Sequence, residues 1–174
     1  ELYDATNTPT FVLSDDDIAH GVTTLAETDA FLHLSSISTT VGGAQLTGLA
    51  DATGTALRLK GIQSSDPTDT TPAISLVAAK ASGTGVVDLG AAETVLQIAN
   101  NDDTAAITVL GDGKVGIATT SPTNILSFGG NSARTIWLER HTTSNTAGSA
   151  LTIQSGGATS AATDKSAGDL VLKS

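Results

Sequence analysis

Three consecutive carboxylates, Asp15, Asp16 and Asp17, are the first residues whose type suggests chemistry, because calcium prefers oxygen ligands. A coordinating loop needs alternating Asp-x-Asp-x-Asp-Gly spacing and a distal Glu, and this run has neither. Since it directly follows Ser14, the run is interpreted as a capped first turn or a solvated loop. We predict no metal ligands here.

Two further polar clusters, Asn100-Asn101-Asp102-Asp103 and Gly111-Asp112-Gly113, consist of residue types that favour turns. Asn and Asp side chains bond to the nearby backbone, and Gly adopts positive φ angles without steric cost. Both clusters are therefore predicted to be turns rather than ion sites.

The histidines, His20, His33 and His141, show no spacing typical of metal ligands within one chain. His33 lies between Leu32 and Leu34, so it is predicted to face solvent if those leucines face inward. About a threefold axis, one histidine per chain would supply a three-nitrogen metal site. His33 or His141 is the candidate for that alternative.

The residue types give no indication of catalysis. The chain has no Gly-x-Ser-x-Gly nucleophile motif, and no carboxylate is set apart from the solvated majority as a general acid. Cysteine is absent, which excludes disulfides and thiolate-bound zinc. We predict no catalytic residues, no cofactor and no bound metal, so the protein is not expected to be an enzyme.

The charge of the chain argues against a nucleic-acid partner. Its 18 acidic and 8 basic residues give a formal net charge of −10, and the basic residues are spread singly, whereas a phosphate backbone needs a basic stripe. No apolar run approaches the ~18 residues of a membrane-spanning helix, and no secretory signal opens the chain. Methionine is absent even at position 1, so we expect a processed product or a segment of a longer protein.

Large apolar side chains are scarce. Leu, Ile, Val and Phe account for 41 of 174 residues, only just above the ~20% below which chains tend to be disordered. Ala, Gly, Ser and Thr together make up about half of the chain. Since a compact monomer of this size buries about 70% of its unfolded surface, the composition predicts that one chain cannot fill a core of its own.

The large apolar residues come in short clusters, most of them with the i, i+2 spacing of a strand that has one buried face. Turn-forming residues separate the clusters, and helical spacing is not sustained anywhere. The chain is therefore predicted to be all-β, with short strands at residues 31–34, 57–60, 74–77, 86–89, 95–98, 107–110, 125–128, 136–138, 151–153 and 170–172.

One hairpin can be placed at residues 106–117, where two alternating runs flank the turn Gly111-Asp112-Gly113. Both glycines are predicted to supply the positive φ angles of the turn. Pro122 follows soon after the second run and is expected to end that strand, because proline cannot donate to a ladder.

Irregular spacing between the clusters does not fit the nearly constant rungs of a stacked solenoid. Three copies wound about one axis would resolve the shortage of core residues, because each chain then supplies only one apolar face per layer. We therefore expect an elongated, intertwined homotrimeric β-fibre, with a β-sandwich or a β-solenoid as alternatives.

Three parts are expected along the chain. Residues 1–30 form an acidic connecting segment, and residues 31–123 form a β-rich fibre module that contains the hairpin. Residues 124–174 form a second β-rich module, which we expect to continue beyond Ser174.

Threonine triplets and the single tryptophan suggest ligand surfaces. Thr8-Pro9-Thr10, Thr53-Gly54-Thr55 and Thr68-Asp69-Thr70 have the Thr-x-Thr pattern of ice-binding arrays, but their uneven spacing does not align them on one face, so they are predicted to be loops. Trp137, within Ile136-Trp137-Leu138, has the shape of a sugar-stacking platform, but its apolar neighbours predict packing at an interface.

Residues 111–122, Gly-Asp-Gly-Lys-Val-Gly-Ile-Ala-Thr-Thr-Ser-Pro, resemble the G-x-V-G-I-G-T-T-x-P element that recurs in bacteriophage tail-fibre and tailspike-like proteins. The segments 130–140, 151–157 and 168–174 are similar to sequences that accompany this element. Ala118 departs from the pattern, which has Gly there. If that position needs a positive φ angle, Ala costs about 1 kcal/mol or more.

The resemblance implies a virion or extracellular fibre segment and no catalytic residues, because the matching element is structural. The expected function is a stalk or receptor-proximal spacer of a viral tail fibre. It would self-associate as a homotrimer or polymer and contact a host-surface glycan or protein, without membrane insertion. The alternatives are a subunit of a bacterial surface or secreted filament that assembles by strand exchange, and a carbohydrate-binding module.

Overall fold

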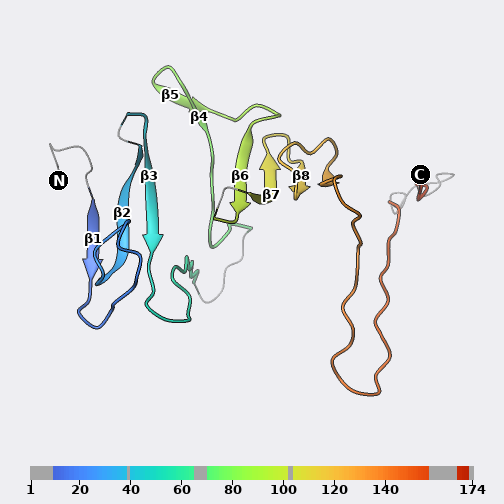
Figure 1. Ribbon diagram of the computed structural model, residues 1–174. Coiled ribbons are helices and arrows are strands. Elements are labelled where there is room, and N and C mark those ends of the chain that lie inside the picture. Colours follow the sequence, from blue (N-terminus) through green and yellow to red (C-terminus); the bar gives the residue numbers. More distant parts are fainter. Residues whose placement is uncertain (1–9, 39, 65–69, 102–103, 157–167, 173–174) are drawn as a thin grey trace. The chain divides into compact units, whose positions relative to one another are not determined.

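The computed structural model describes residues 10–38, 40–64, 70–101, 104–156 and 168–172, and all regular elements within them are β-strands (Figure 1). The predicted all-β class is therefore confirmed. The chain divides into two compact units, Glu1–Leu76 and Val77–Ser174. This division falls inside the 31–123 module expected from composition.

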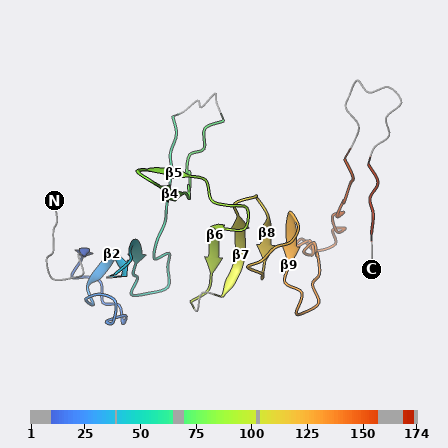
Figure 2. The same cartoon turned by 90° about the horizontal axis from the view of Figure 1, so that it is seen from above.

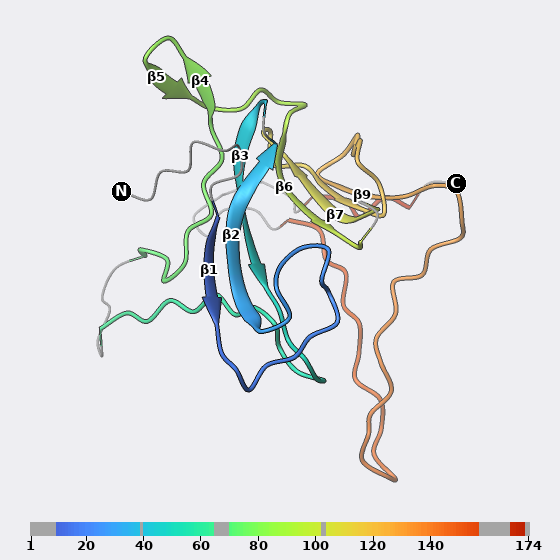
Figure 3. The same ribbon diagram turned by 60° about the vertical axis from the view of Figure 1, so that its left-hand side comes forward.

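The first unit contains a three-stranded antiparallel sheet in the order β1-β2-β3 (Figure 3). Its strands are β1 (Phe11–Ser14), β2 (Ala30–Ser38) and β3 (Gly42–Gly48). The predicted strand 31–34 lies within β2. After β2 the chain reverses through Gly42 and Gly43, which have φ angles of 78° and 89°, values that favour glycine because it lacks a Cβ.

The second unit contains a small hairpin and a four-stranded sheet. The hairpin pairs β4 (Lys80–Ser82) with β5 (Gly85–Val87). The sheet has the order β6-β7-β8-β9, and Figure 2 shows these strands in that sequence. Its strands are β6 (Thr94–Ala99), β7 (Ala105–Leu110), β8 (Val115–Ile117) and β9 (Leu126–Phe128). The predicted strands at 95–98 and 107–110 are confirmed, and the one at 125–128 begins one residue later.

The hairpin predicted at 106–117 is formed by β7 and β8, with Thr108 opposite Gly116. One part of that prediction is wrong. Of the two glycines in this turn, Gly113 has a positive φ angle, 82°, and Gly111 does not. Gly111 is needed for a different reason. Its backbone approaches the Gly90 carbonyl so closely that a Cβ at Gly111 would collide with it. The chain before β6 and the β7–β8 turn can therefore pack together.

Five predicted strands, at 57–60, 74–77, 136–138, 151–153 and 170–172, are not strands in the structure. Their alternating apolar residues are present but exposed. The period-2 pattern sets a tendency to be extended, whereas a strand also needs a hydrogen-bonded neighbour. Within the described chain these segments have none, and this is the physical reason for the difference.

The apolar core is very small. Among the described residues, Ala30, Leu110 and Pro122 are the only buried apolar side chains. The shortage of core residues expected from composition is thus visible in the folded chain.

Candidate interaction surface

The four-stranded sheet of the second unit carries a continuous apolar face. Partners directly opposite one another in a sheet point to the same side, so the register aligns eight apolar residues in two rows across the strands. We call these residues the ladder face: Ile98, Ile107, Ile117 and Phe128 in one row, and Leu96, Val109, Val115 and Leu126 in the other.

The ladder face is open in the single chain. Its five residues on the outer strands and strand ends (Leu96, Ile98, Ile117, Leu126 and Phe128) are between 38% and 53% exposed. Ile107, Val109 and Val115 are half-buried, mainly because neighbouring strands flank them. A contiguous apolar patch of this kind typically marks an interaction site.

The opposite face of the same sheet is closed by the chain itself. Thr108 and Gly116 are buried there, and Pro122 is buried in the connection between β8 and β9. The Thr119 carbonyl of this connection lies so close to Gly116 that a Cβ at Gly116 would collide with it. Glycine is therefore required at position 116, and one side of the sheet needs no further cover.

Thr108 is a residue that sequence reasoning missed. It is fully buried, and its Oγ1 has no hydrogen-bond partner within the described residues. The alternation along β7 could have indicated that Thr108 is buried, because Thr108 lies two residues from the buried Leu110 and therefore on the same side of the strand. The larger Ile107 and Val109 point to the face that the chain leaves uncovered.

The sheet of the first unit also exposes an apolar face. Phe11, Leu34 and Leu46 stand opposite one another across its three strands, and Leu13 lies opposite Leu32. Phe11, Leu34 and Leu46 are all exposed. A groove of about 350 Å³ lies beside Phe11 and Leu34. Both large sheets thus present apolar faces without cover from the described chain.

His33 differs from its sequence-based expectation. Its side chain is partly buried, as is that of Leu32, whereas Leu34 is exposed, so the expectation's condition that both leucines face inward is not met. His33 lies on the other face of the sheet, between Val12 and Thr47.

The other two histidines accept local backbone hydrogen bonds. His20 is buried, and its Nδ1 accepts from the Val22 amide at 3.1 Å, while its Nε2 has no partner within the described chain. His141 Nδ1 accepts from the Thr143 amide at 3.1 Å. Among the described residues, no group of three or more His, Asp or Glu is arranged to hold a metal ion.

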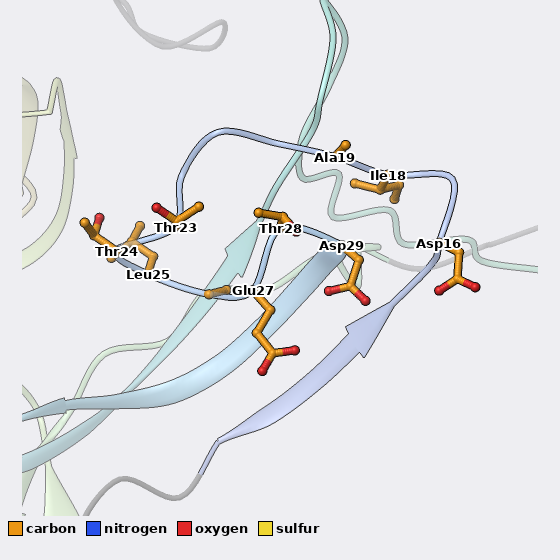
Figure 4. Close-up of a pocket in the computed structure, with 10 residues that line it drawn as sticks. Asp16, Ile18, Ala19, Thr23, Thr24, Leu25, Glu27, Thr28 and Asp29 are labelled. Atoms are coloured by element: carbon orange, nitrogen blue, oxygen red, sulfur yellow. The ribbon is translucent and has the colours of Figure 1, made fainter.

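The Asp15–Asp17 run forms a turn at the end of β1. The Asp17 amide donates to Asp15 Oδ1 at 3.1 Å, and the Ile18 amide donates to the Asp15 carbonyl at 2.9 Å. The solvated-loop interpretation is confirmed. Figure 4 shows an open depression beside this turn, with the carboxylates of Asp16, Glu27 and Asp29 spaced along one side of the loop.

The other polar clusters also form turns where they are described. The Asn101 amide donates to Asn100 Oδ1 at 2.9 Å, and the Lys114 amide donates to Asp112 Oδ1 at 3.2 Å. Asp102 and Asp103 lie outside the described residues. Thr53-Gly54-Thr55 is a bend and loop, whereas most of the other two threonine triplets lies outside the described residues.

Two ion pairs fix local geometry in the second unit. Lys80 Nζ lies 2.9 Å from Glu93 Oε1, and Lys114 Nζ lies 2.7 Å from Asp112 Oδ2. The backbone hydrogen bond from Gly90, followed by that from Lys80, lowers the pKa of Glu93. The hydrogen bond from the Lys114 side chain lowers the pKa of Asp112. Both carboxylates are thereby held ionised, the opposite of what a general acid at neutral pH requires.

The described part of the chain contains no helix that is long and apolar enough to cross a membrane. Comparison with known protein families, with curated proteins and with solved structures yields no match to this chain. The function therefore has to be inferred from the residues and surfaces of the chain itself.

Proposed function

We propose that this chain is a structural segment of an extracellular fibre of the viral tail-fibre kind, and that it assembles as a homotrimer. It acts as a stalk or a receptor-proximal spacer. Its contribution is mechanical, because it sets length and stiffness and holds a recognition element away from the particle. A host-surface glycan or protein is the expected distal partner.

The open ladder face is the observation that carries this proposal. In a trimer, three such faces turn toward a common axis and form one core between the chains. Completing the burial of partly exposed Ile, Leu, Val and Phe side chains contributes on the order of 1 kcal/mol each. Eight such residues per chain supply enough apolar surface for a stable interface.

The backbone at Ala118 supports the resemblance to tail-fibre proteins. Ala118 has a φ angle of 55°, in the left-handed region that glycine favours. The resembling element has glycine at this position. The chain thus keeps the backbone conformation that this glycine favours, even though the residue has changed.

Light scattering after size-exclusion chromatography tests the proposal. The expected mass is that of three chains, independent of concentration across the loading range. Val109→Asp should abolish assembly, because it buries an unpaired charge at a cost of several kcal/mol. Ala106→Asp is the matched control, since it adds the same charge at an exposed position of β7 that does not belong to the ladder face.

Two results would overturn the trimeric assembly. One is a wild-type chain that is monomeric at every concentration. The other is a Val109→Asp chain with the same mass and thermal stability as the Ala106→Asp control.

A bacterial filament subunit that assembles by strand exchange is the second candidate. The extended segment around Ile136 and Ile153, which is exposed and not hydrogen-bonded as a strand, favours it. An open filament and a closed trimer differ in one measurable property, because the mass of a filament grows with protein concentration.

A further inference from the structure

Residues 131–156, which we call the arm, run as two extended lengths of chain joined by a turn at 142–145 (Figures 1 and 3). Asn145, with a φ angle of 60°, completes the turn. The arm follows the path of a hairpin, and each of its two lengths contains an apolar cluster typical of a strand. Neither length is a strand in the single chain.

The backbone of the arm is largely without partners. Within the described chain, its hydrogen bonds are confined to its base and its turn. Arg134 Nε donates to the Gly129 carbonyl at 3.1 Å, the Thr143 amide donates to His141 Nδ1, and Thr146 Oγ1 donates to the Ser144 carbonyl. Residues 135–140 and 147–153 make no backbone hydrogen bonds to other described residues. Free rows of N–H and C=O groups are templates for pairing with another chain.

The side chains of the arm are those of a buried strand. Ile136, Trp137 and Leu138 are consecutive, so in a strand they would point to both faces, a pattern typical of strands covered on both sides. In the single chain Trp137 is 66% exposed and Ile136 is 62% exposed. On the returning length, Leu151 and Ile153 are also exposed and would share one face.

The arm carries a small positive net charge, which favours an acidic partner. Arg134, Arg140 and Glu139 give it a net charge of +1 in a chain whose total is −10. The remainder of the same chain is therefore complementary to the arm. A second copy of the chain brings the same uncovered sheets, with apolar residues such as Leu34 and Leu126 exposed on them, against which the exposed Trp137 can pack.

We propose that the arm pairs through its backbone with a second copy of this chain and becomes a β-strand element only in the assembly. The inference rests on the proposed self-assembly and identifies the segment that carries it. Pairing satisfies the free backbone groups of 135–140 and 147–153, and it covers Trp137 with the neighbouring copy.

Trp137 makes the test direct, because it is the single tryptophan among the 174 residues. Its fluorescence and its quenching by acrylamide are measured across a dilution series, alongside mass by light scattering. On assembly the emission should shift to shorter wavelength and the quenching constant should fall several-fold. Amide hydrogen exchange, followed by mass spectrometry, should slow by about 100-fold or more at 135–140 and 150–154.

A pair of variants separates burial from added charge. Leu138→Asp should shift the assembly midpoint to at least ~10-fold higher protein concentration, because a charge enters a covered strand. Ser132→Asp adds the same charge at the exposed base of the arm and should leave the midpoint within about twofold.

The possible outcomes are distinguishable. If the wild-type chain assembles while Trp137 stays solvent-exposed and the arm amides exchange at unstructured rates, the inference is wrong and the proposed function stands. If the arm is already protected in a dilute monomer, it pairs within its own chain and the inference is wrong. If the wild-type chain never assembles, both the inference and the proposed function are wrong.

Discussion

Ala118 is the residue at which backbone geometry and side chain disagree most clearly. Its φ angle of 55° is unfavourable for an L-residue with a Cβ, at a cost of about 1 kcal/mol or more. The position lies immediately after β8, where the Ala118 amide donates to the Ala106 carbonyl at 2.9 Å. That hydrogen bond and the contact with Gly129 hold the strained conformation in place.

Ala118→Gly should therefore stabilise the protein by about 1 kcal/mol, because glycine adopts this φ angle without steric cost. The measurement is the midpoint of urea unfolding at one fixed protein concentration. Ala106→Gly is the control, since the same exchange in a regular strand should destabilise by about 0.5–1 kcal/mol. If Ala118→Gly and Ala106→Gly destabilised the protein equally, the backbone strain inferred at position 118 would be contradicted.

Gly116→Ala should destabilise the sheet, by about 1–3 kcal/mol, because the added Cβ collides with the Thr119 carbonyl. Thermal unfolding followed by circular dichroism measures the effect. Gly130→Ala is a suitable control, since a Cβ at Gly130 meets no atom within 4 Å. A melting temperature for Gly116→Ala equal to that of the control would argue against the close packing of the β8–β9 connection.

At the scale of elements, the Lys80–Glu93 pair joins the β4–β5 hairpin to the start of β6. Glu93 also accepts a hydrogen bond from the Gly90 amide and so fixes the turn that precedes the strand. Both side chains are about half exposed, so salt screens the pair and its contribution to stability is small.

The pH dependence of this pair follows from the lowered pKa of Glu93. Since the folded-state pKa lies below the unfolded value of 4.5, the stabilisation is present above pH 4.5 and is lost as the pH falls through the folded pKa. The protection of the 80–93 amides, which is their hydrogen-exchange rate relative to the intrinsic rate at the same pH, should therefore decrease on acidification below about pH 4.5. Glu93→Gln should remove that decrease, whereas Glu139→Gln should retain it. An unchanged pH profile in Glu93→Gln would contradict the role of the pair.

At the scale of the whole molecule, the small number of buried apolar side chains is the observation that most favours the proposed self-assembly. Among the described residues, the chain buries only Ala30, Leu110 and Pro122 of its apolar side chains. A stable isolated domain of this length would bury many more. In the proposed assembly, further stability comes from surfaces that the single chain leaves open, foremost the ladder face.

The melting temperature should accordingly rise with protein concentration, because assembly stabilises only the folded form. Differential scanning calorimetry over a 100-fold concentration range measures this. A small domain that is stable alone would melt at one temperature throughout, and that result would contradict a core shared between chains.

Much of the local structure could be predicted from the sequence by itself. The alternation of Ile107 and Val109 and the turn at Gly113 predicted β7, β8 and their hairpin, because these signals are local and need no distant partner. The scarcity of Leu, Ile, Val and Phe predicted a poor core. The same alternation predicted strands around Trp137 and Ile153, which the single chain does not form.

Only the tertiary structure decided which apolar faces are covered. Thr108 and Gly116 are buried, and the β8–β9 connection lies close against Gly116, whereas the ladder face stays open. This difference depends on the path of the chain after Ile117. Period-2 alternation separates the two faces of a strand, but it does not say which face the chain itself will close. Coverage is a property of segments distant in sequence that meet in space, and in this protein it leaves the ladder face open.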